Sequence, residues 1–202
     1  MEMTGRDGVL YVPSKSSYIR GEQGKSFAFT DAARLGMLQA VADHNPWMRV
    51  IDREVFSEVQ PRTYDTLCSI RDSGYQPALL MGSDKLPELE HIWKHVEEIT
   101  EQFGIVCMCR GMDDVQKMIS EDPYLKSISA GITILQTPPA LRKISSTAVR
   151  SILQQIRNVR EQSGPERSLE NLIISLKELV PEEVAQFILG EELTAGQNGG
   201  IE

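Results

Sequence analysis

The sequence predicts an α/β fold in which helices cover a doubly wound parallel sheet. Short runs of β-branched and other apolar residues alternate with segments whose apolar residues recur at helical spacing. This alternation is typical of a parallel sheet built from strand–helix units. From about residue 165 onward only helical patterns occur, so we expect a helical C-terminal segment. We predict a single domain over residues 1–189 and a disordered, glycine-containing tail over residues 190–202.

Five segments have the composition of strands: Val9–Val12, Met48–Ile51, Pro77–Met81, Ile105–Cys109 and Ile128–Leu135. The third is a continuous apolar run, which predicts burial on both faces of the sheet. A polar loop is expected after the first strand, up to about residue 26.

The helices are predicted from caps and periodicity. Thr30 is expected to cap a helix whose Ala32, Leu35, Leu38 and Ala42 share one face. Further helices are predicted over residues 63–73, 89–103, 113–121, 145–160, 169–179 and 181–189. The helix over 89–103 is defined by a long apolar stripe closed by a glycine.

Composition excludes several classes of function. The net charge of −8 argues against a general nucleic-acid binder, which needs a basic face. No run of 18 apolar residues occurs, so no membrane-spanning segment is expected. The odd set Cys68, Cys107 and Cys109 fits reduced thiols and a cytoplasmic protein.

A metal site is also considered. His91 and His95 are spaced four residues apart, and with Glu88 they could in principle hold a metal ion. The glutamate of an H-E-x-x-H pattern is replaced by Ile92, so the favoured interpretation is a solvated helix face, and no metal site is predicted.

The most informative segment for chemistry is Ile144–Arg150, which opens a predicted helix with two serines and a threonine. The first N–H groups of a helix have no partner within the helix, and the helix dipole adds partial positive charge there. Hydroxyl groups at such an end form an anion site, and Arg150, one turn further on, has the fork geometry that suits phosphate. The alternative interpretation is an ordinary serine cap beside a surface arginine.

Other segments extend this pattern along the chain: Tyr11–Ser14, Arg62–Leu67, Leu80–Leu86 with Trp93, and Leu179–Val184. Together with Ile144–Arg150, they resemble, in order, motifs of the nicotinate- and nicotinamide-nucleotide adenylyltransferase family of the nucleotidylyltransferase superfamily. The matches are to a second strand and its loop, Y-T-x-D-T-L with an arginine at its first position, G-x-D-x-L followed by W, I-S-S-T-x-x-R, and L-V-P-x-x-V. The resemblance implies a Rossmann-like sheet of the nucleotidylyltransferase type.

The resemblance also implies an ATP site. Ser146, Thr147 and Arg150 would bind the phosphates, Gly82 would let the backbone approach the nucleotide, and Asp84 would accept hydrogen bonds from it. An alternative role for Asp84, at the end of a strand, is to cap the following helix.

A second set of residues would bind the pyridine mononucleotide. In the family pattern, Trp93 stacks on the pyridine ring with Thr63 near it, Arg110 lies near the substrates, and Lys25 meets the mononucleotide phosphate. Lys15 competes with Lys25 for that role. The alternatives are that Trp93 belongs to the core and that Lys25 is a solvated loop residue.

One family feature is missing. The family begins with a strand and a G-x-F-x-P-x-H-x-G-H loop, whereas histidine occurs here only as His44, His91 and His95. No catalytic residue is therefore assigned. Either the start of the chain is truncated or another strand fills the gap, and the sequence does not distinguish the two. Open sheet edges would favour pairing with a second copy, so a homo-oligomer is expected.

Three hypotheses for function follow. The first is adenylyl transfer from ATP, with Mg²⁺, to nicotinate mononucleotide, which gives the dinucleotide and pyrophosphate in NAD biosynthesis. The second is a non-catalytic or truncated nucleotide-binding member of the family. The third is a related cytidylyl- or pantetheine-phosphate adenylyltransferase. The residues do not decide between the acid and the amide mononucleotide.

Overall fold

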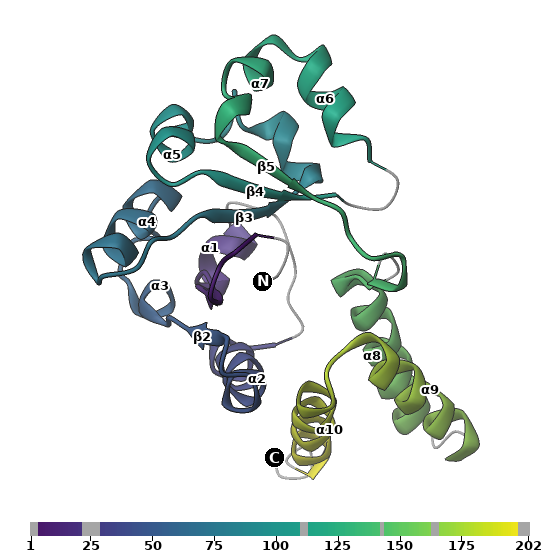
Figure 1. The fold of residues 1–202 in the computed structure, drawn as a ribbon. Coiled ribbons are helices and arrows are strands. Elements are labelled where there is room, and N and C mark those ends of the chain that lie inside the picture. The colour runs from purple at the N-terminus through teal and green to yellow at the C-terminus, as the bar shows by residue number, and fades with distance from the viewer. Residues whose placement is uncertain (1–3, 22–28, 110–112, 142–143, 163–165, 198–202) are drawn as a thin grey trace. The chain divides into compact units, whose positions relative to one another are not determined.

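The structure is a computed structural model that describes residues 4–21, 29–109, 113–141, 144–162 and 166–197, without the side chains of residues 19–20 and 191–197. The chain folds into two compact units (Figure 1). The first unit comprises Met1–Gln60 and Ile144–Glu202, and the second unit comprises Pro61–Lys143. Both units contain parallel strands and helices, and the first unit also contains the C-terminal helices. This arrangement confirms the α/β class. The prediction of one domain over residues 1–189 stays a prediction.

The first unit contains a two-stranded parallel sheet. Strands β1 (Val9–Tyr11) and β2 (Met48–Val50) pair in register and are joined through α2 (Asp31–His44). The predicted cap is confirmed, since the side chain of Thr30 accepts a hydrogen bond from the backbone N–H of Ala33 at 3.2 Å.

Two short helices of the first unit are missing from the sequence prediction. Helix α1 (Ser16–Gly21) lies where a polar loop was expected, and α3 (Arg53–Phe56) follows β2. Ser16 is buried, and its backbone N–H and hydroxyl both donate to Asp31, so a contact across the chain fixes the start of α1. Local periodicity contains no information about such a contact.

Three helices complete the first unit: α8 (Ser146–Glu161), α9 (Glu166–Leu179) and α10 (Glu182–Gln197). Leu153, Ile156, Leu176 and Ile188 form their buried core. Helix α10 also packs on α2, where the Cβ of any residue larger than Gly36 would lie 2.6 Å from the Phe187 ring. Helix α10 runs past residue 189, at which the predicted helix ends.

The second unit contains a three-stranded parallel sheet with the order β3 (Leu79–Gly82), β4 (Ile105–Met108) and β5 (Ile132–Leu135). Gly82 and Met108 lie opposite each other at the carboxyl ends of β3 and β4. The remaining elements are α4 (Thr63–Asp72), η1 (Ser83–Glu88), α5 (Val96–Gln102), α6 (Val115–Glu121), α7 (Pro123–Ser127), η2 (Ser129–Gly131) and η3 (Pro139–Leu141).

The main core cluster of the second unit lies on one face of its sheet, and the buried Val106 of β4 points to the other face. Met81, Ile105 and Cys107 belong to the buried cluster, whereas Leu80 and Met108, on the opposite face, are 47% and 38% exposed. The expectation that β3 is buried on both faces is therefore wrong for Leu80. A continuous apolar run in the sequence does not show which faces of the strand are covered by neighbouring elements.

The single helix predicted over residues 89–103 is also wrong. His95 has a φ of 61°, in the left-handed region that a continuing α-helix does not use, and α5 begins only after it. The apolar stripe nevertheless identified core residues, because Leu89, Val96 and Ile99 are buried. Helical spacing here predicted burial correctly for these residues, but it was wrong for Ile92, which is 66% exposed, and wrong about the continuity of the helix.

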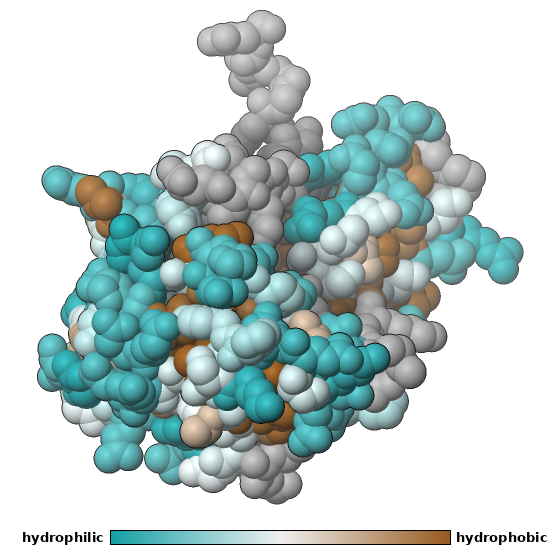
Figure 2. Space-filling model, turned by 90° about the horizontal axis from the view of Figure 1, so that it is seen from above, coloured by the Kyte–Doolittle hydropathy of each residue, from teal (hydrophilic) through white to brown (hydrophobic). Residues whose placement is uncertain are grey.

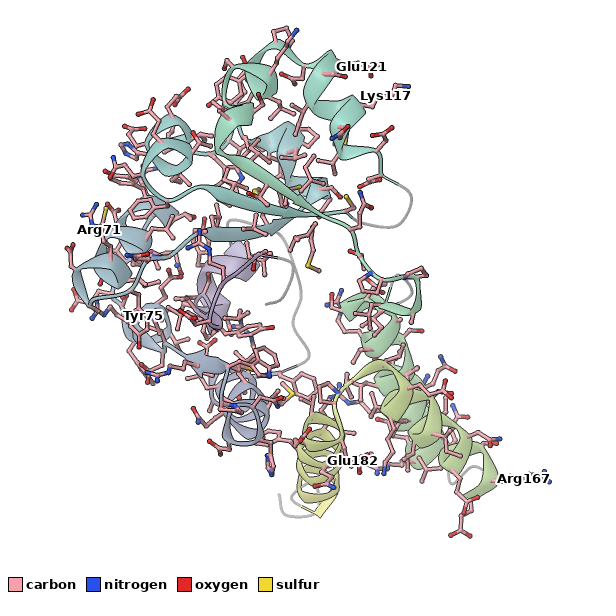
Figure 3. All side chains as sticks on the ribbon, in the orientation of Figure 1. Arg71, Tyr75, Lys117, Glu121, Arg167 and Glu182 are labelled. Atoms are coloured by element: carbon pink, nitrogen blue, oxygen red, sulfur yellow. The ribbon has the colours of Figure 1, made fainter. Side chains whose placement is uncertain are left out.

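Polar residues dominate the face of the molecule shown in Figure 2. The face shown in Figure 2 is mostly hydrophilic, and hydrophobic residues emerge on it in small separate areas. On α6, Lys117 and Glu121 point outward (Figure 3) and form an ion pair with Nζ 3.8 Å from Oε1. Exposed pairs of this kind contribute little to stability, so burial of apolar residues is the main stabilising factor.

Among the described helices, none has the length and apolar character needed to cross a membrane.

A close backbone approach in the second unit gives a stability prediction. A Cβ at Gly131 would lie 2.5 Å from the carbonyl oxygen and 2.8 Å from the Cβ of Thr100. Since a backbone cannot move aside as a side-chain tip can, we expect Gly131→Ala to lower the free energy of unfolding by about 1–3 kcal/mol. Urea denaturation followed by circular dichroism measures this.

The matched control is Gly190→Ala, because no atom lies within 4 Å of a Cβ built at Gly190 on α10. Alanine there is expected to leave stability unchanged or to raise it by up to about 1 kcal/mol through helix propensity. Equal losses in both variants would contradict the packing argument for Gly131.

Candidate functional site

The start of α8 has the features expected of an anion site. Ser145 is the N-cap, and its side chain accepts a hydrogen bond from the backbone N–H of Ala148 at 3.2 Å. Ser146 and Thr147, the first two residues of the helix, are exposed. Two hydroxyl groups and the positive end of the helix dipole are thus presented to solvent at one place.

Arg150 belongs to the same helix end. Its Nη2 donates to the hydroxyl of Thr147 at 3.2 Å, so the guanidinium group turns back toward the first turn of α8. A cation held there adds to the helix dipole, and its remaining N–H groups can donate to an anion in a planar fork. The structure therefore brings together the three predicted phosphate-binding residues Ser146, Thr147 and Arg150.

A second group of predicted residues belongs to the second unit. Gly82 ends β3 and is the N-cap of η1, and Asp84 lies exposed in the first turn of η1. The carboxyl ends of parallel strands are where open α/β sheets bind ligands. The N-cap position of η1 is Gly82, and Asp84 lies inside the first turn.

The predicted ring-binding residues of the second unit lie in different elements. Thr63 is the first residue of α4 and is half-buried. Trp93 lies between η1 and α5, and it is half-buried and packs against the core cluster of the unit. The packing of Trp93 against the cluster supports its interpretation as a core residue, and part of Trp93 remains accessible to solvent.

The two basic residues predicted near the mononucleotide, Lys25 and Arg110, lie outside the described residues. The competing candidate Lys15 is described. Its Nζ donates to the carbonyl oxygen of Ser57 at 3.0 Å, and its backbone N–H donates to Gln60 Oε1 at 3.3 Å. Lys15 therefore holds together the segments that follow β1 and β2.

A polar network after β1 was not found by sequence reasoning. Arg34 Nη1 donates to the carbonyl oxygen of Ser14 at 2.9 Å and to Asp31 Oδ1 at 3.1 Å. Partial burial of Asp31 acts to raise its pKa, but hydrogen bonds from Ser16 and the charge of Arg34 outweigh this and lower the pKa below its usual value. The buried Glu54 accepts a bond from the Ser14 hydroxyl at 3.2 Å. These contacts fix the loop at the carboxyl end of β1.

The three histidines of the chain each contact a neighbouring backbone or side-chain group. His44, on the last turn of α2, contacts the carbonyl oxygen of Ala40, and His91 lies 3.2 Å from Glu90. His95 stacks on Tyr64 with ring centroids 5.0 Å apart and pairs with a carboxylate of α5. His91 and His95 do not share a helix, because α5 begins after His95. Within the described part of the chain, no group of three metal-ligating side chains is found.

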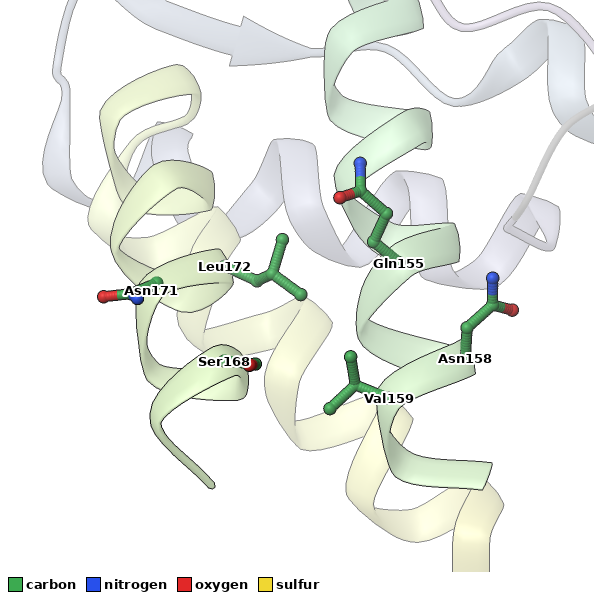
Figure 4. A pocket seen from close by; sticks show the side chains of 6 residues that line it. All are labelled: Gln155, Asn158, Val159, Ser168, Asn171 and Leu172. Atoms are coloured by element: carbon green, nitrogen blue, oxygen red, sulfur yellow. The ribbon is translucent and has the colours of Figure 1, made fainter. Parts of the chain in front are cut away.

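An open groove of about 390 Å³ lies between α8 and α9 (Figure 4). It is lined by Gln155, Asn158, Val159, Ser168, Asn171 and Leu172. None of these residues belongs to the predicted binding set. The groove lies further along α8 than the first turn, which contains the exposed Ser146 and Thr147.

Comparison with known proteins establishes the family. The family model described as cytidylyltransferase-like matches residues 3–152, a range that includes both Gly82–Asp84 and Ser146–Arg150. The chain belongs to this cytidylyltransferase-like family. It is therefore a member of the nucleotidyltransferases, for which the substrate is a nucleotide, and the predicted Rossmann-like α/β class is confirmed.

Two relatives of this cytidylyltransferase-like chain have more specific names. A probable nicotinate-nucleotide adenylyltransferase of Helicobacter hepaticus is 26% identical over 168 residues, which cover 74% of this chain and 75% of the relative. A probable nicotinate-nucleotide adenylyltransferase of Caldicellulosiruptor bescii is 25% identical over 138 residues, which cover 65% and 66%. The resemblance found in the motifs is thus confirmed as a distant one, and the chain spans about two thirds to three quarters of these relatives.

Proposed function

We propose that the chain transfers the adenylyl group of ATP to nicotinate mononucleotide, releasing pyrophosphate and forming the dinucleotide used in NAD biosynthesis. The observation that carries the proposal is the start of α8, where Ser146, Thr147 and Arg150 converge inside the range that matches the family. The names of the relatives supply the acceptor, since both are described as probable nicotinate-nucleotide adenylyltransferases.

The reaction places specific demands on these residues. A phosphate oxygen of the mononucleotide attacks the α-phosphorus of ATP in line. The bond between the α-phosphorus and the oxygen that bridges it to the β-phosphorus breaks, and pyrophosphate leaves with that oxygen. ATP would be used together with Mg²⁺, which would offset part of the negative charge of the phosphates. Catalysis of phosphoryl transfer comes mainly from positioning and from neutralising charge. The helix end and Arg150 would meet the phosphates as negative charge moves to the leaving group.

The remaining residues would hold the two substrates. Asp84 would accept hydrogen bonds from the nucleotide, and Gly82 would let it approach the backbone. Trp93 would stack on the pyridine ring with Thr63 beside it, and Lys25 and Arg110 would meet the mononucleotide. These roles follow the family pattern, and the exposure of Asp84 and the accessible part of Trp93 are compatible with them.

A second candidate function is nucleotide binding without turnover. It is favoured by the missing H-x-G-H motif, because the histidines of the chain are His44 on α2 and His91 and His95 between η1 and α5. They contact a backbone carbonyl or nearby carboxylates. Loss of a transition-state donor costs about 10²–10³ in rate, whereas binding depends on the whole set of contacts.

Two measurements separate these candidates. Pyrophosphate release is followed with ATP, Mg²⁺ and either nicotinate or nicotinamide mononucleotide, and ATP binding is followed by calorimetric titration. CTP in place of ATP tests for a cytidylyltransferase. Turnover with ATP and nicotinate mononucleotide would support the proposal, and ATP binding without turnover would support the second candidate. If neither binding nor turnover occurs, both are wrong.

A further inference from the structure

Ser83 stands between two residues of the proposed nucleotide site and has a different environment from both. Its side chain is fully buried, whereas the neighbouring Asp84 is exposed. The hydroxyl of Ser83 donates to Asp113 Oδ2 at 2.7 Å. A buried hydroxyl cannot touch a ligand in solution, so this bond must act on the protein itself.

The bond joins two neighbouring strand ends of the second unit. Ser83 follows β3 directly, and Asp113 lies in the segment that leads from β4 to α6. Gly82 and Met108 are paired in register at the carboxyl edge of these strands. The bond therefore fixes the turn after β3 to the segment after β4, at the edge where parallel sheets bind ligands.

A second observation places the carboxylates at this edge. The pKa of the Cys107 thiol is raised to about 11, first by burial, then by Cys109, and then by the negative charges of Asp113 and Asp84. Both carboxylates therefore lie close enough to the end of β4 to act on the same thiol.

Asp113 is not needed to cap the helix that follows it. The N-cap of α6 is Asp114, whose side chain accepts a hydrogen bond from the backbone N–H of Lys117 at 3.0 Å. Two adjacent aspartates thus have separate partners, one within its own helix and one in the turn after β3.

We propose that Ser83 and Asp113 are positioning residues for the nucleotide: their hydrogen bond sets the turn Gly82–Asp84 so that Asp84 faces the ligand. With the Ser83 side chain held inward, the next residue of the tight η1 turn is directed outward. The proposal rests on the proposed function, because it assigns the orientation of Asp84 to a hydrogen bond from the buried Ser83 hydroxyl to the exposed Asp113.

The test measures the dissociation constant for ATP in Ser83→Ala, Asp113→Ala and the double variant. We expect each single variant to weaken ATP binding roughly tenfold and the double variant to be no weaker than either, since all three lose the same interaction. Asp113→Asn keeps an oxygen that accepts the Ser83 hydroxyl, so it should restore most of the affinity.

The matched control is Asp114→Ala, which removes the cap of α6 at the neighbouring position. It should lower the melting temperature and leave ATP affinity unchanged. Unchanged ATP affinity in Ser83→Ala and Asp113→Ala, additive losses in the double variant, or equal losses in Asp113→Asn and Asp113→Ala would each overturn the proposal. Absence of ATP binding by the unaltered chain would instead overturn the proposed function, and this inference with it.

Discussion

Replacement of Arg150 by alanine is expected to weaken ATP binding about 10–150-fold, because a hydrogen bond to a charged group contributes about 1.5–3 kcal/mol. The guanidinium turns toward the first turn of α8, where it donates to Thr147. Without it, the phosphates lose a planar donor and a positive charge at the same place. Calorimetric titration with ATP and Mg²⁺ measures the change.

Two variants make this prediction specific. Arg150→Lys keeps the charge but not the fork, so its loss of affinity should be intermediate. Arg160 lies in the last turn of the same helix, and Arg160→Ala should leave ATP affinity unchanged although it removes an equal charge from the chain. Equal losses in Arg150→Ala and Arg160→Ala would mean that total charge, and not the start of α8, governs binding.

The second large effect concerns stability. Ile99, on α5, is 1% exposed and belongs to the core cluster of the second unit together with Leu86 and Phe103. Ile99→Ala should lower the free energy of unfolding by about 2–5 kcal/mol, through lost burial and the cavity left behind. The free energy of unfolding of a whole protein is typically about 5–15 kcal/mol, so this loss would be a large part of it. Urea denaturation followed by circular dichroism measures it.

The chain contains a matched control of the same residue type. Ile92 is 66% exposed and lies in the same unit, so Ile92→Ala should change the free energy of unfolding by no more than about 0.5 kcal/mol. A comparable loss in both variants would show that Ile92 is covered in solution and that the assignment of the core is incomplete.

Features that depend on neighbouring residues in sequence were predictable. The cap at Thr30 was predicted from the residue type before an apolar periodic segment, and it is confirmed. The serine pair Ser145–Ser146 indicated a cap for the next long helix, and Ser145 is the residue that caps it. The convergence of Ser146, Thr147 and Arg150 follows from the same principle, because the geometry of one helix turn fixes it.

Features that depend on contacts across the chain were not predictable. The start of α1 is set by bonds between Ser16 and Asp31, and the turn after β3 is bonded to Asp113. The left-handed conformation of His95 interrupts a stripe whose spacing is otherwise helical. The partial exception is Asp113, since it follows a predicted strand next to the one that precedes Ser83, and neighbouring parallel strands end at the same edge.

The division of the chain has a consequence for its synthesis. The second unit is one continuous segment, Pro61–Lys143, whereas the first unit needs both Met1–Gln60 and Ile144–Glu202. Helix α2, near the beginning, packs on α10, near the end, through Gly36 and Phe187. Because ribosomes deliver a chain from its N-terminal side, the continuous second unit can fold during translation, whereas the packing of α2 on α10 must wait until α10 has been made.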